Sequence, residues 1–364
     1  MRDLTRSFLL TVSTAGLAAV IATACSDVPT GVPDGATFAA ARVGTAPYTV
    51  LDLGVLAGDN TSRVNGVNDA GIAVGYSANF TSFRPFAMLG GVMTALPGGE
   101  GQAFAISDGG APHVVGSLDG RPVRWLLTAG AAGNPEYLNT GTGTFGAARG
   151  VNDAGAAVGN VGNGAALWDA AGNLALVETP QGFTRGEGRG INNDGLAVFV
   201  FRHNAAGWEG GMAVGYLRLA SGALVPLPPV GNDVVSYVNG LNAVAANTVQ
   251  IAGSTYADPE TSRAVRWTVN ATTGEILATD IRPERSHALA VSDEGDFAGF
   301  VEGRPNSLKS TAFIVTGNSL LSLKVPKKAR DGKAWAMSAS GDFIGGEAIV
   351  QLSRRAVLWS ATSQ

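Results

Sequence analysis

Residues 64–71 read Val-Asn-Gly-Val-Asn-Asp-Ala-Gly, and variants of this phrase recur along the 364-residue chain. The Asn or Ser in the middle of each copy serves as an anchor, and the seven anchors are Asn68, Ser107, Asn152, Asn192, Asn242, Ser292 and Ser338. Neighbouring anchors are on average about 45 residues apart, and self-similarity at such a period is the sign of a repeat architecture.

Each copy has the pattern of a strand that ends in a tight turn. The residue before the anchor is always large and apolar, and the one before that is always Gly or Ala. This alternation fits a strand that packs one face and is crowded by a neighbour on the other. Six copies have Gly three residues after the anchor, where a hairpin turn requires positive φ. The fifth copy, at Asn242, lacks this Gly, so we expect a longer turn there.

Three further strand-like segments follow in most copies. Examples are IAVGYS at 72–77, RAVRW at 263–267 and a looser Leu-containing segment, ALVPLP, at 223–228. Four strands in a unit of about 45 residues are typical of a β-propeller blade.

The two ends of the repeat region complement each other. The seventh copy stops at Trp359 without a fourth strand, whereas TVLDL at 49–53 resembles a fourth strand without a blade. We therefore predict an all-β, seven-bladed β-propeller over residues 47–364, with four antiparallel strands per blade. The N-terminal strand would complete the last blade and remove an open sheet edge. A solenoid, the alternative repeat fold, explains that strand less well.

The stretch YTVLDLGVLAGDNTSRVNGVNDAGIAVGYS (48–77) resembles the bacterial extracellular HAF repeat. That repeat has a Leu-Gly segment, a Ser-containing turn, a G-[IV]-N-x-x-G strand, a V-V-G strand and an aromatic strand that ends in Trp. The fourth copy departs from it, because Phe199 stands where the V-V-G glycine belongs. The resemblance implies an extracellular propeller. It transfers no functional residues, because these repeats share no established activity.

The N-terminus has the features of a secretory signal peptide. Basic residues precede an apolar run from Phe8 to Ala24, which is short for a membrane span. The run ends in Ala22-Thr23-Ala24-Cys25, which resembles a bacterial lipobox with Ala22 in place of the preferred Leu. The resemblance implies removal of residues 1–24, a lipid anchor in the membrane on Cys25 and, from Ser26 after it, sorting to the outer membrane of the cell envelope. The alternative is an ordinary signal peptide with an unmodified Cys25.

The segment after the signal peptide and the overall composition limit the partners. Residues 25–46 are rich in Pro, Gly and small side chains, so we expect a flexible tether.

A net charge of −4 offers no basic surface for nucleic acid. His113, His203 and His287 lack the spacing of metal ligands, and no calcium-loop pattern occurs, so we expect neither metal nor cofactor. We expect a monomer.

Several repeated side chains have structural explanations. Four arginines open third strands, and four tryptophans close them: Arg84, Arg121, Arg263 and Arg355, and Trp125, Trp168, Trp267 and Trp359. We expect the arginines to pair with turn carboxylates or carbonyls rather than to form an anion site. The tryptophans should pack between blades rather than bind sugars, and Trp335 on an innermost strand should be packed as well. The asparagines and aspartates of the repeated turns should cap their own hairpin backbone, the alternative being weak cation binding.

Insertions that interrupt the repeat are the candidate binding loops, because a blade does not need them in order to fold. They span 128–146, 201–211 and 255–262. The candidate contact residues in the last two are Arg202, His203, Trp208, Glu209 and Tyr256. The alternative is that these loops are irregular and solvated.

The sequence therefore predicts a lipid-anchored binding scaffold for an unknown protein or glycan partner, without catalysis. The alternative function is a propeller hydrolase or lyase that acts on a cell-surface polysaccharide. Such an enzyme requires paired carboxylates, or a histidine with an acid, that converge from different blades at one mouth of the propeller.

Overall fold

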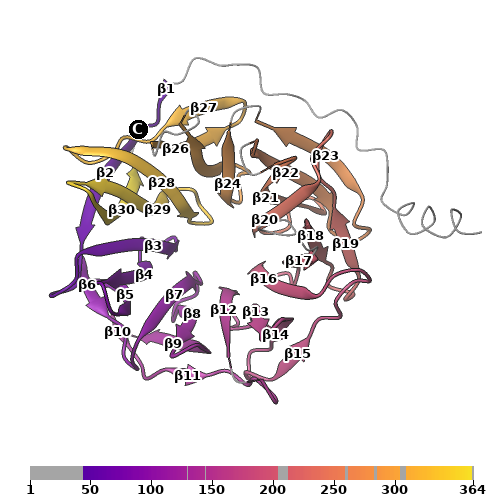
Figure 1. Cartoon of the computed structure of the whole chain (residues 1–364), viewed down its shortest axis with the longest axis horizontal. Helices are drawn as coiled ribbons and strands as arrows, with labels where there is room; N and C mark the ends of the chain where they lie inside the picture. Colours follow the sequence, from indigo (N-terminus) through magenta and orange to yellow (C-terminus); the bar gives the residue numbers. More distant parts are fainter. Residues whose placement is uncertain are drawn as a thin grey trace, which may run out of the picture.

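The computed structural model describes residues 44–128, 130–143, 145–203, 212–258, 261–282, 285–303 and 309–362. These residues form seven antiparallel sheets arranged around a central axis (Figure 1). The predicted seven-bladed β-propeller with four-stranded blades is confirmed. None of the described residues forms a helix long and apolar enough to cross a membrane.

The strands of each blade follow one another from the axis outward. Blade 1 contains β3 (Thr61–Val67), β4 (Ala73–Ala78), β5 (Phe83–Leu89) and β6 (Val92–Ala95). Blade 2 contains β7 (Gly101–Ile106), β8 (His113–Leu118), β9 (Arg121–Thr128) and β10 (Ala131–Ala132), and β11 (Glu136–Tyr137) also pairs with β9. Blade 3 contains β12 (Gly146–Val151), β13 (Ala157–Val161), β14 (Gly164–Trp168) and β15 (Leu174–Leu176). Blade 4 contains β16 (Arg185–Ile191), β17 (Ala197–His203), β18 (Met212–Arg218) and β19 (Leu224–Leu227).

The remaining three blades have the same plan. Blade 5 contains β20 (Val235–Leu241), β21 (Thr248–Tyr256), β22 (Arg263–Asn270) and β23 (Ile276–Ile281). Blade 6 contains β24 (Ser286–Val291), β25 (Phe297–Glu302), β26 (Ser310–Thr316) and β27 (Ser319–Ser322), and β1 (Gly44–Thr45) adds a parallel strand to β27. Blade 7 contains β28 (Ala329–Met337), β29 (Phe343–Val350), β30 (Ser353–Ala361) and β2 (Tyr48–Gly54).

Strand β2 closes the ring as predicted. It pairs antiparallel with β30, with Val50 opposite Trp359, so the first long strand and the last lie in one sheet (Figure 1). The Tyr48 hydroxyl donates to the Gly341 carbonyl at 2.7 Å and ties this strand to the turn of blade 7. Residues at the end of the predicted tether also join the domain, since β1 pairs with β27 and Ala46 is buried.

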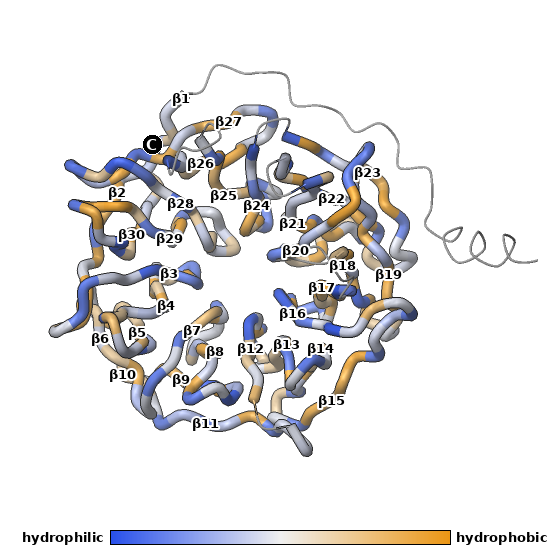
Figure 2. Tube along the Cα trace, in the orientation of Figure 1, coloured by the Kyte–Doolittle hydropathy of each residue, from blue (hydrophilic) through white to orange (hydrophobic). Residues whose placement is uncertain are grey.

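The hydrophobic core lies within and between neighbouring blades. The four tryptophans that close third strands are fully buried, as predicted, and Trp125 donates its indole N–H to the Pro97 carbonyl at 2.9 Å. Figure 2 shows apolar residues along the strands and polar residues at many of their ends and turns. Packing therefore accounts for these tryptophans without a ligand.

The arginines that open third strands are largely structural, as expected. Arg84 pairs with Asp59 at 2.8 Å, Arg263 with Asp233 at 2.6 Å and Arg355 with Asp52 at 3.4 Å. The fourth differs, because the Arg121 guanidinium lies 4.3 Å from the centre of the Tyr137 ring.

The turns after the anchors follow the predicted chemistry with one exception. Five of the six expected glycines have φ between 72° and 85°. Gly110 does not, because the turn of blade 2 is longer and the Ser107 N–H bonds to the His113 carbonyl. The turn without Gly is longer still, as predicted: the Asn242 N–H bonds to the Gln250 carbonyl, whereas the Asn68 N–H bonds to the Ile72 carbonyl.

A β-bulge interrupts every innermost strand at the third residue before its anchor. The seven bulged residues, which the pairing register skips, are Asn65, Phe104, Arg149, Arg189, Asn239, Leu289 and Trp335. A bulge adds one residue to one strand and can redirect its side chain. Each innermost strand therefore presents one side chain that the regular ladder does not constrain.

The bulge explains the glycine of the V-V-G segment. A Cβ on Gly75 would lie 1.9 Å from the Arg63 carbonyl oxygen of the partner strand, so only glycine fits. In blade 4, Phe199 takes this place and Gly188 stands opposite it. The residue without a side chain has moved to the other strand of the pair.

The Gly/Ala column before the apolar residue reflects close contact between blades. A Cβ on Gly150 would lie 2.8 Å from the Gly190 Cα of the next blade, and one on Gly66 would lie 3.0 Å from the Ala105 Cα. The predicted crowding by a neighbour is therefore contact between innermost strands around the axis.

A substitution in the V-V-G column should strain the fold. We expect Gly75→Ala to lower the free energy of unfolding by about 2 kcal/mol or more, because the new methyl group collides with backbone. Thermal and denaturant unfolding measure this. Gly110→Ala is the matched control, since Gly110 has nothing within 4 Å of a Cβ and no positive φ. Equal stability of the two variants would contradict this explanation of the glycine.

Candidate binding site at the mouth of the central channel

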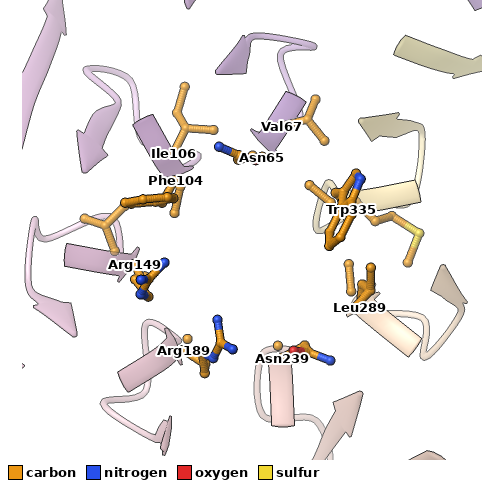
Figure 3. Close-up of a pocket in the computed structure, with 18 of the residues that line it drawn as sticks. Asn65, Val67, Phe104, Ile106, Arg149, Arg189, Asn239, Leu289 and Trp335 are labelled. Carbon is orange, nitrogen blue, oxygen red and sulfur yellow. The ribbon is translucent and has the colours of Figure 1, made fainter. Parts of the chain in front are cut away.

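The central channel has an apolar waist with a different mouth on each side. The waist consists of the apolar residues that precede the anchors: Val67, Ile106, Val151, Ile191, Leu241, Val291 and Met337. Four anchors (Ser107, Asn152, Asn192 and Asn242) and most of the residues that directly follow an anchor line a cavity on one side, which we call the anchor mouth. The bulged residues line a cavity on the other side, which we call the bulge mouth (Figure 3).

Hydrogen bonds between blades occupy the anchor mouth. Asn68 donates its amide N–H to the Ser107 carbonyl at 3.0 Å, and Asn192 donates to the Asn242 carbonyl at 2.9 Å. The Asn68 amide oxygen also accepts from the Ile72 N–H of its own turn. Each such anchor therefore stabilises its own turn and links it to the next blade.

The anchor asparagines cap their own turns as expected, whereas the turn aspartates cap the neighbouring turn, which corrects that part of the expectation. Asp108 accepts from the Asp69 N–H at 2.6 Å, and Asp153 accepts from the Asp108 N–H at 2.8 Å. Asp69 accepts from the Ser340 N–H at 2.8 Å, which joins blade 7 to blade 1. The turns of adjacent blades lie close enough that a short carboxylate reaches across. Among the described residues, no group of three or more His, Cys, Asp or Glu side chains could hold a metal ion.

The charged form of Asp108 is destabilised by this arrangement. Partial burial raises the pKa of its carboxyl group, and the nearby carboxylates of Asp69, Asp153 and Asp293 raise it further, although the bond from the Asp69 N–H opposes the rise. Asn193 occupies the corresponding position in blade 4, where it accepts from the Asp153 N–H and donates to the Asp153 carboxylate at 2.7 Å. An amide therefore fits this position.

Asp108→Asn should stabilise the protein at pH 7. A folded-state pKa above the unfolded value means that this carboxyl's contribution to stability falls as pH rises from about 4 through the folded pKa. The variant should therefore melt about 1 to 3 °C higher at pH 7 and no higher at pH 3. The reciprocal change, Asn193→Asp, places a carboxylate against Asp153 and should lower the melting temperature at pH 7. Melting curves at both pH values test this; a destabilised Asp108→Asn at pH 7 would contradict it.

The bulge mouth differs from the rest of the repeat because its residues vary from blade to blade. Figure 3 shows the bulged side chains around the channel, with Arg149 beside Phe104 and Trp335 on the opposite side. The two asparagines are engaged between blades: Asn65 donates to the Ala103 carbonyl at 2.7 Å, and Asn239 donates to the Ala288 carbonyl at 2.9 Å. The arginines and aromatic residues remain as the distinctive groups of this mouth.

Three arginines share one carboxylate at this mouth. Glu187 forms ion pairs with Arg149, with Arg189 at 3.8 Å and with Arg202 at 3.5 Å. Burial lowers the pKa of Arg149, and the charges of Arg189 and Arg202 lower it further, whereas Glu187 raises it. The cluster extends into a second cavity between blades 3 and 4, lined by Arg149, Arg185, Glu187 and Arg202. The charged residues that line the two cavities are thus four arginines and a single carboxylate.

Aromatic rings hold several of the cations in place. The Arg63 guanidinium lies 4.5 Å from the centre of the Trp335 ring, and the Arg149 guanidinium lies 4.7 Å from that of Phe104. The Lys333 ammonium lies 4.3 Å from that of Phe300. Within the described part of the chain, neither Arg63 nor Lys333 forms an ion pair. Such cation–π contacts position a charge without neutralising it.

Trp335 corrects the expectation that it is packed like the other tryptophans. It is half-buried and lines the bulge mouth, whereas Trp359 of the same blade is fully buried. Its indole N–H has no hydrogen-bond partner among the described residues. The difference arises because Trp335 is a bulged residue of the innermost strand.

The structure brings two of the predicted loop residues together on Tyr237, and one of them, Arg202, also lines the cavity next to this mouth. The Arg202 guanidinium lies 5.2 Å from the centre of the Tyr237 ring, and Tyr256 stacks on the same ring at 6.0 Å. Burial raises the pKa of Tyr256. His203 is the last residue of β17 and pairs with Met212 in the sheet. Trp208, Glu209 and Cys25 lie outside the described residues.

Sequence reasoning missed Arg149, Arg189 and Trp335 as site residues. The available signal was the variability of one column: the residue before the small Gly/Ala differs in chemistry among the copies, whereas its neighbours do not. The repeat constrains the neighbours through packing, and a column without that constraint is free to serve function.

A separate polar cluster surrounds His287. Its Nδ1 lies 3.2 Å from the Ser254 hydroxyl, and its Nε2 lies 3.3 Å from the Glu302 carboxylate. The bond to His287 lowers the pKa of Glu302, and Arg285 pairs with the same carboxylate at 3.0 Å. Ser254 and Ser262, the serines that contact the ring, are each only 2% exposed. Neither hydroxyl is therefore accessible as a nucleophile, whereas the His287 and Glu302 side chains are 24% and 33% exposed.

Comparisons with known proteins support the fold. No family model matches the chain, and no curated protein matches its sequence. Virginiamycin B lyase from Staphylococcus aureus has a similar structure, with a TM-score of 0.53 and 13% identity over 86% of this chain and 100% of the lyase. YCF48 bound to D1 peptide is similar with a TM-score of 0.52 and 10% identity over 89% of this chain and 100% of YCF48. At these identities the similarity concerns the propeller fold alone.

Proposed function

We propose that this protein is a non-catalytic binding scaffold of the bacterial cell envelope, which presents the bulge mouth to its ligand. One observation carries the proposal: the seven bulged residues differ in chemistry although the repeat around them is regular. The fold requires a bulge at this position but not a particular side chain. Variation of the bulged residues supports the view that they were selected to contact a ligand.

The electrostatics of the bulge mouth support a binding role. The chain carries a net charge of −4, yet the charged residues that line the mouth and the adjoining cavity are four arginines and one glutamate. Clefts lined by one sign of charge attract ligands of the opposite sign. The site is thus suited to an anionic ligand on an otherwise acidic protein.

The alternative, a hydrolase or lyase for surface polysaccharide, receives less support. The carboxylates that converge from different blades lie at the anchor mouth, where Asp69, Asp108 and Asp153 accept backbone N–H groups. At the bulge mouth, Glu187 is paired with arginines. His287 and Glu302 belong to a single blade. Within the described residues we therefore find no free acid–base pair at either mouth.

The cellular location in this proposal comes from the N-terminal sequence. The apolar run that ends in Ala22-Thr23-Ala24-Cys25 favours lipid attachment at Cys25, and the HAF-like repeats favour an extracytoplasmic site. A lipid anchor, a tether and a rigid propeller together form a surface-held binding module. Ser26 after the cysteine favours the outer membrane.

The bulge mouth should control ligand binding. On arrays of envelope glycans and peptides, we expect the full chain to bind a subset of features, and Arg149→Ala/Trp335→Ala to lose at least about tenfold in affinity for them. Arg121→Ala is the control, since Arg121 also stacks on an aromatic ring but lies on β9, away from the axis. Unchanged binding by the double variant would contradict the location of the site. Cleavage of a bound glycan would favour the enzyme alternative.

Cys25 should determine membrane association. Expressed with its own signal in a Gram-negative host, the protein should partition into detergent and incorporate labelled palmitate, whereas Cys25→Ser should do neither, because the side chain would lack the sulfur that carries the lipid. Ser26→Ala is the control and should retain the label. Labelling of Cys25→Ser would show that the lipid anchor is misassigned, and an unlabelled wild type would favour an ordinary signal peptide.

A further inference from the structure

We propose that the bulge mouth takes an amphiphilic carboxylate: Arg149 and Arg189 receive the carboxylate, and the apolar waist receives an adjoining apolar group. The ligand would be the carboxyl end of a peptide with an apolar last residue, or a free organic acid of the same chemistry. This inference rests on the proposed function and specifies the ligand class of that site.

The arginine cluster has far more donors than Glu187 can satisfy. Each guanidinium carries five N–H groups in a planar fork, whereas one carboxylate offers two oxygens. Arg189 and Arg202 reach Glu187 only at 3.8 Å and 3.5 Å, and their buried Nε–H groups have no hydrogen-bond partner among the described residues, so contact with a ligand falls to the terminal N–H groups. The side chains of Arg149, Arg189 and Arg202 are 26–35% exposed, so a ligand can reach them. A second carboxylate would fit the fork geometry.

The apolar waist determines which chemical group should adjoin the carboxylate of the ligand. Arg149 and Arg189 stand two residues before waist residues Val151 and Ile191 on the same strands. At about 3.3 Å per residue, the waist lies roughly 7 Å from the arginine level along the channel. Ile106, Ile191 and Leu241 are only half-buried and face this cavity. A ligand that joins a carboxylate to an apolar side chain spans this separation.

The polar groups of the mouth disfavour a sugar. Hydroxyl recognition requires side chains that both donate and accept, and the asparagines are the neutral amides of the bulged ring. The Asn65 amide donates to the Ala103 carbonyl while its oxygen accepts from Arg63 Nε at 2.7 Å. The Asn239 amide donates to the Ala288 carbonyl. The Trp335 indole N–H is buried, so the donors that remain for a ligand are cationic and favour an anion over a polyol.

The size of the cavity favours the end of a chain. It measures about 190 Å³, which is below the roughly 300 Å³ at which pockets for whole small-molecule ligands begin. A terminal residue or a short acid fits such a volume, whereas a nucleotide does not. The waist then limits how far the apolar group can enter.

Substitution of Glu187 tests the inference, because it should strengthen ligand binding rather than weaken it. Its carboxylate competes with an incoming carboxylate for the same arginines and repels it at short range. Removal of this charge should therefore strengthen ligand binding, while removal of an arginine should weaken it. A merely structural role for the cluster would not separate the two effects.

Calorimetric titration of the full chain tests the inference. The probes are acetyl-Ala-Ala-Leu with a free carboxylate, the same peptide as its carboxamide, octanoate and glucuronate. We expect the peptide acid or octanoate to bind, and the carboxamide to bind at least about tenfold more weakly than the acid. A preference for the peptide acid assigns the site to peptide ends, and a preference for octanoate assigns it to free organic acids; either result supports the inference. Binding should weaken as salt is raised.

Variants localise the effect. Glu187→Gln should tighten binding about threefold or more, whereas Arg149→Gln and Arg189→Gln should each weaken it about tenfold. Ile106→Thr should reduce the affinity for the peptide acid while leaving the preference for acid over carboxamide unchanged. Arg121→Gln, which removes a stacked arginine far from the mouth, should bind as the wild type does. Melting curves for each variant verify that it is folded.

Several results would overturn the inference. They are equal binding of acid and carboxamide, tighter binding of glucuronate than of both apolar acids, weaker binding by Glu187→Gln, or no binding of any probe. These outcomes leave the proposed function standing if the array still shows ligands that require Arg149 and Trp335. The proposed function itself would be contradicted if binding on the array were unchanged after substitution of Arg149 and Trp335.

Discussion

The innermost strands of the seven blades converge on an axis, and the space between them limits everything else in the structure. A Cβ on Gly150 would lie 2.8 Å from the Gly190 Cα, so adjacent strands approach at backbone distance. Small residues must occupy that column, and the apolar residue after it then fills the waist. The bulge just before this contact brings the Arg63 carbonyl so close to Gly75 that the second strand needs glycine as well. Two of the most regular columns of the repeat thus have one geometric cause.

Closure of the ring adds a second constraint, because every blade must contact two neighbours. Strand β2 supplies the missing edge of blade 7, and Asp69 accepts the Ser340 N–H across the same junction. The anchors and turn aspartates repeat this contact elsewhere around the ring. Polar groups at the anchor mouth are therefore engaged in joining blades, which explains why acidic residues gather there.

Much of the fold was predictable from the sequence because close packing requires the same residue types at regular intervals along the chain. The blade count, the closing strand, the buried tryptophans and the long turn after Asn242 all follow from positions that recur or fail to recur. The bulges were not predictable, because a bulge changes pairing without a residue type of its own. The direction of the Asp108 bond was missed for a related reason: a turn that caps itself and one that caps its neighbour have the same local sequence. Trp335 was misassigned because aromatic character alone does not distinguish a channel-facing position from a core position. The predicted loop residues Arg202 and Tyr256 meet on Tyr237, and the Arg202–Tyr237 contact joins two blades, so no single copy reveals it.

The two mouths of the channel differ because the repeat constrains them differently. At the anchor mouth the chain turns back on itself, and turn chemistry dictates Asn, Ser, Asp and Gly. At the bulge mouth the strand has not yet reached its turn, and the pairing register skips the bulged residue. The repeat therefore does not prescribe one residue type there, and asparagine, arginine, leucine and aromatic residues all occur. Arg149 illustrates the result: burial lowers its pKa, yet Phe104 and Glu187 hold its guanidinium at the channel. A cation kept partly desolvated beside an apolar waist gains from an incoming anion, and this gain is the physical argument for the proposal that a ligand binds at this mouth.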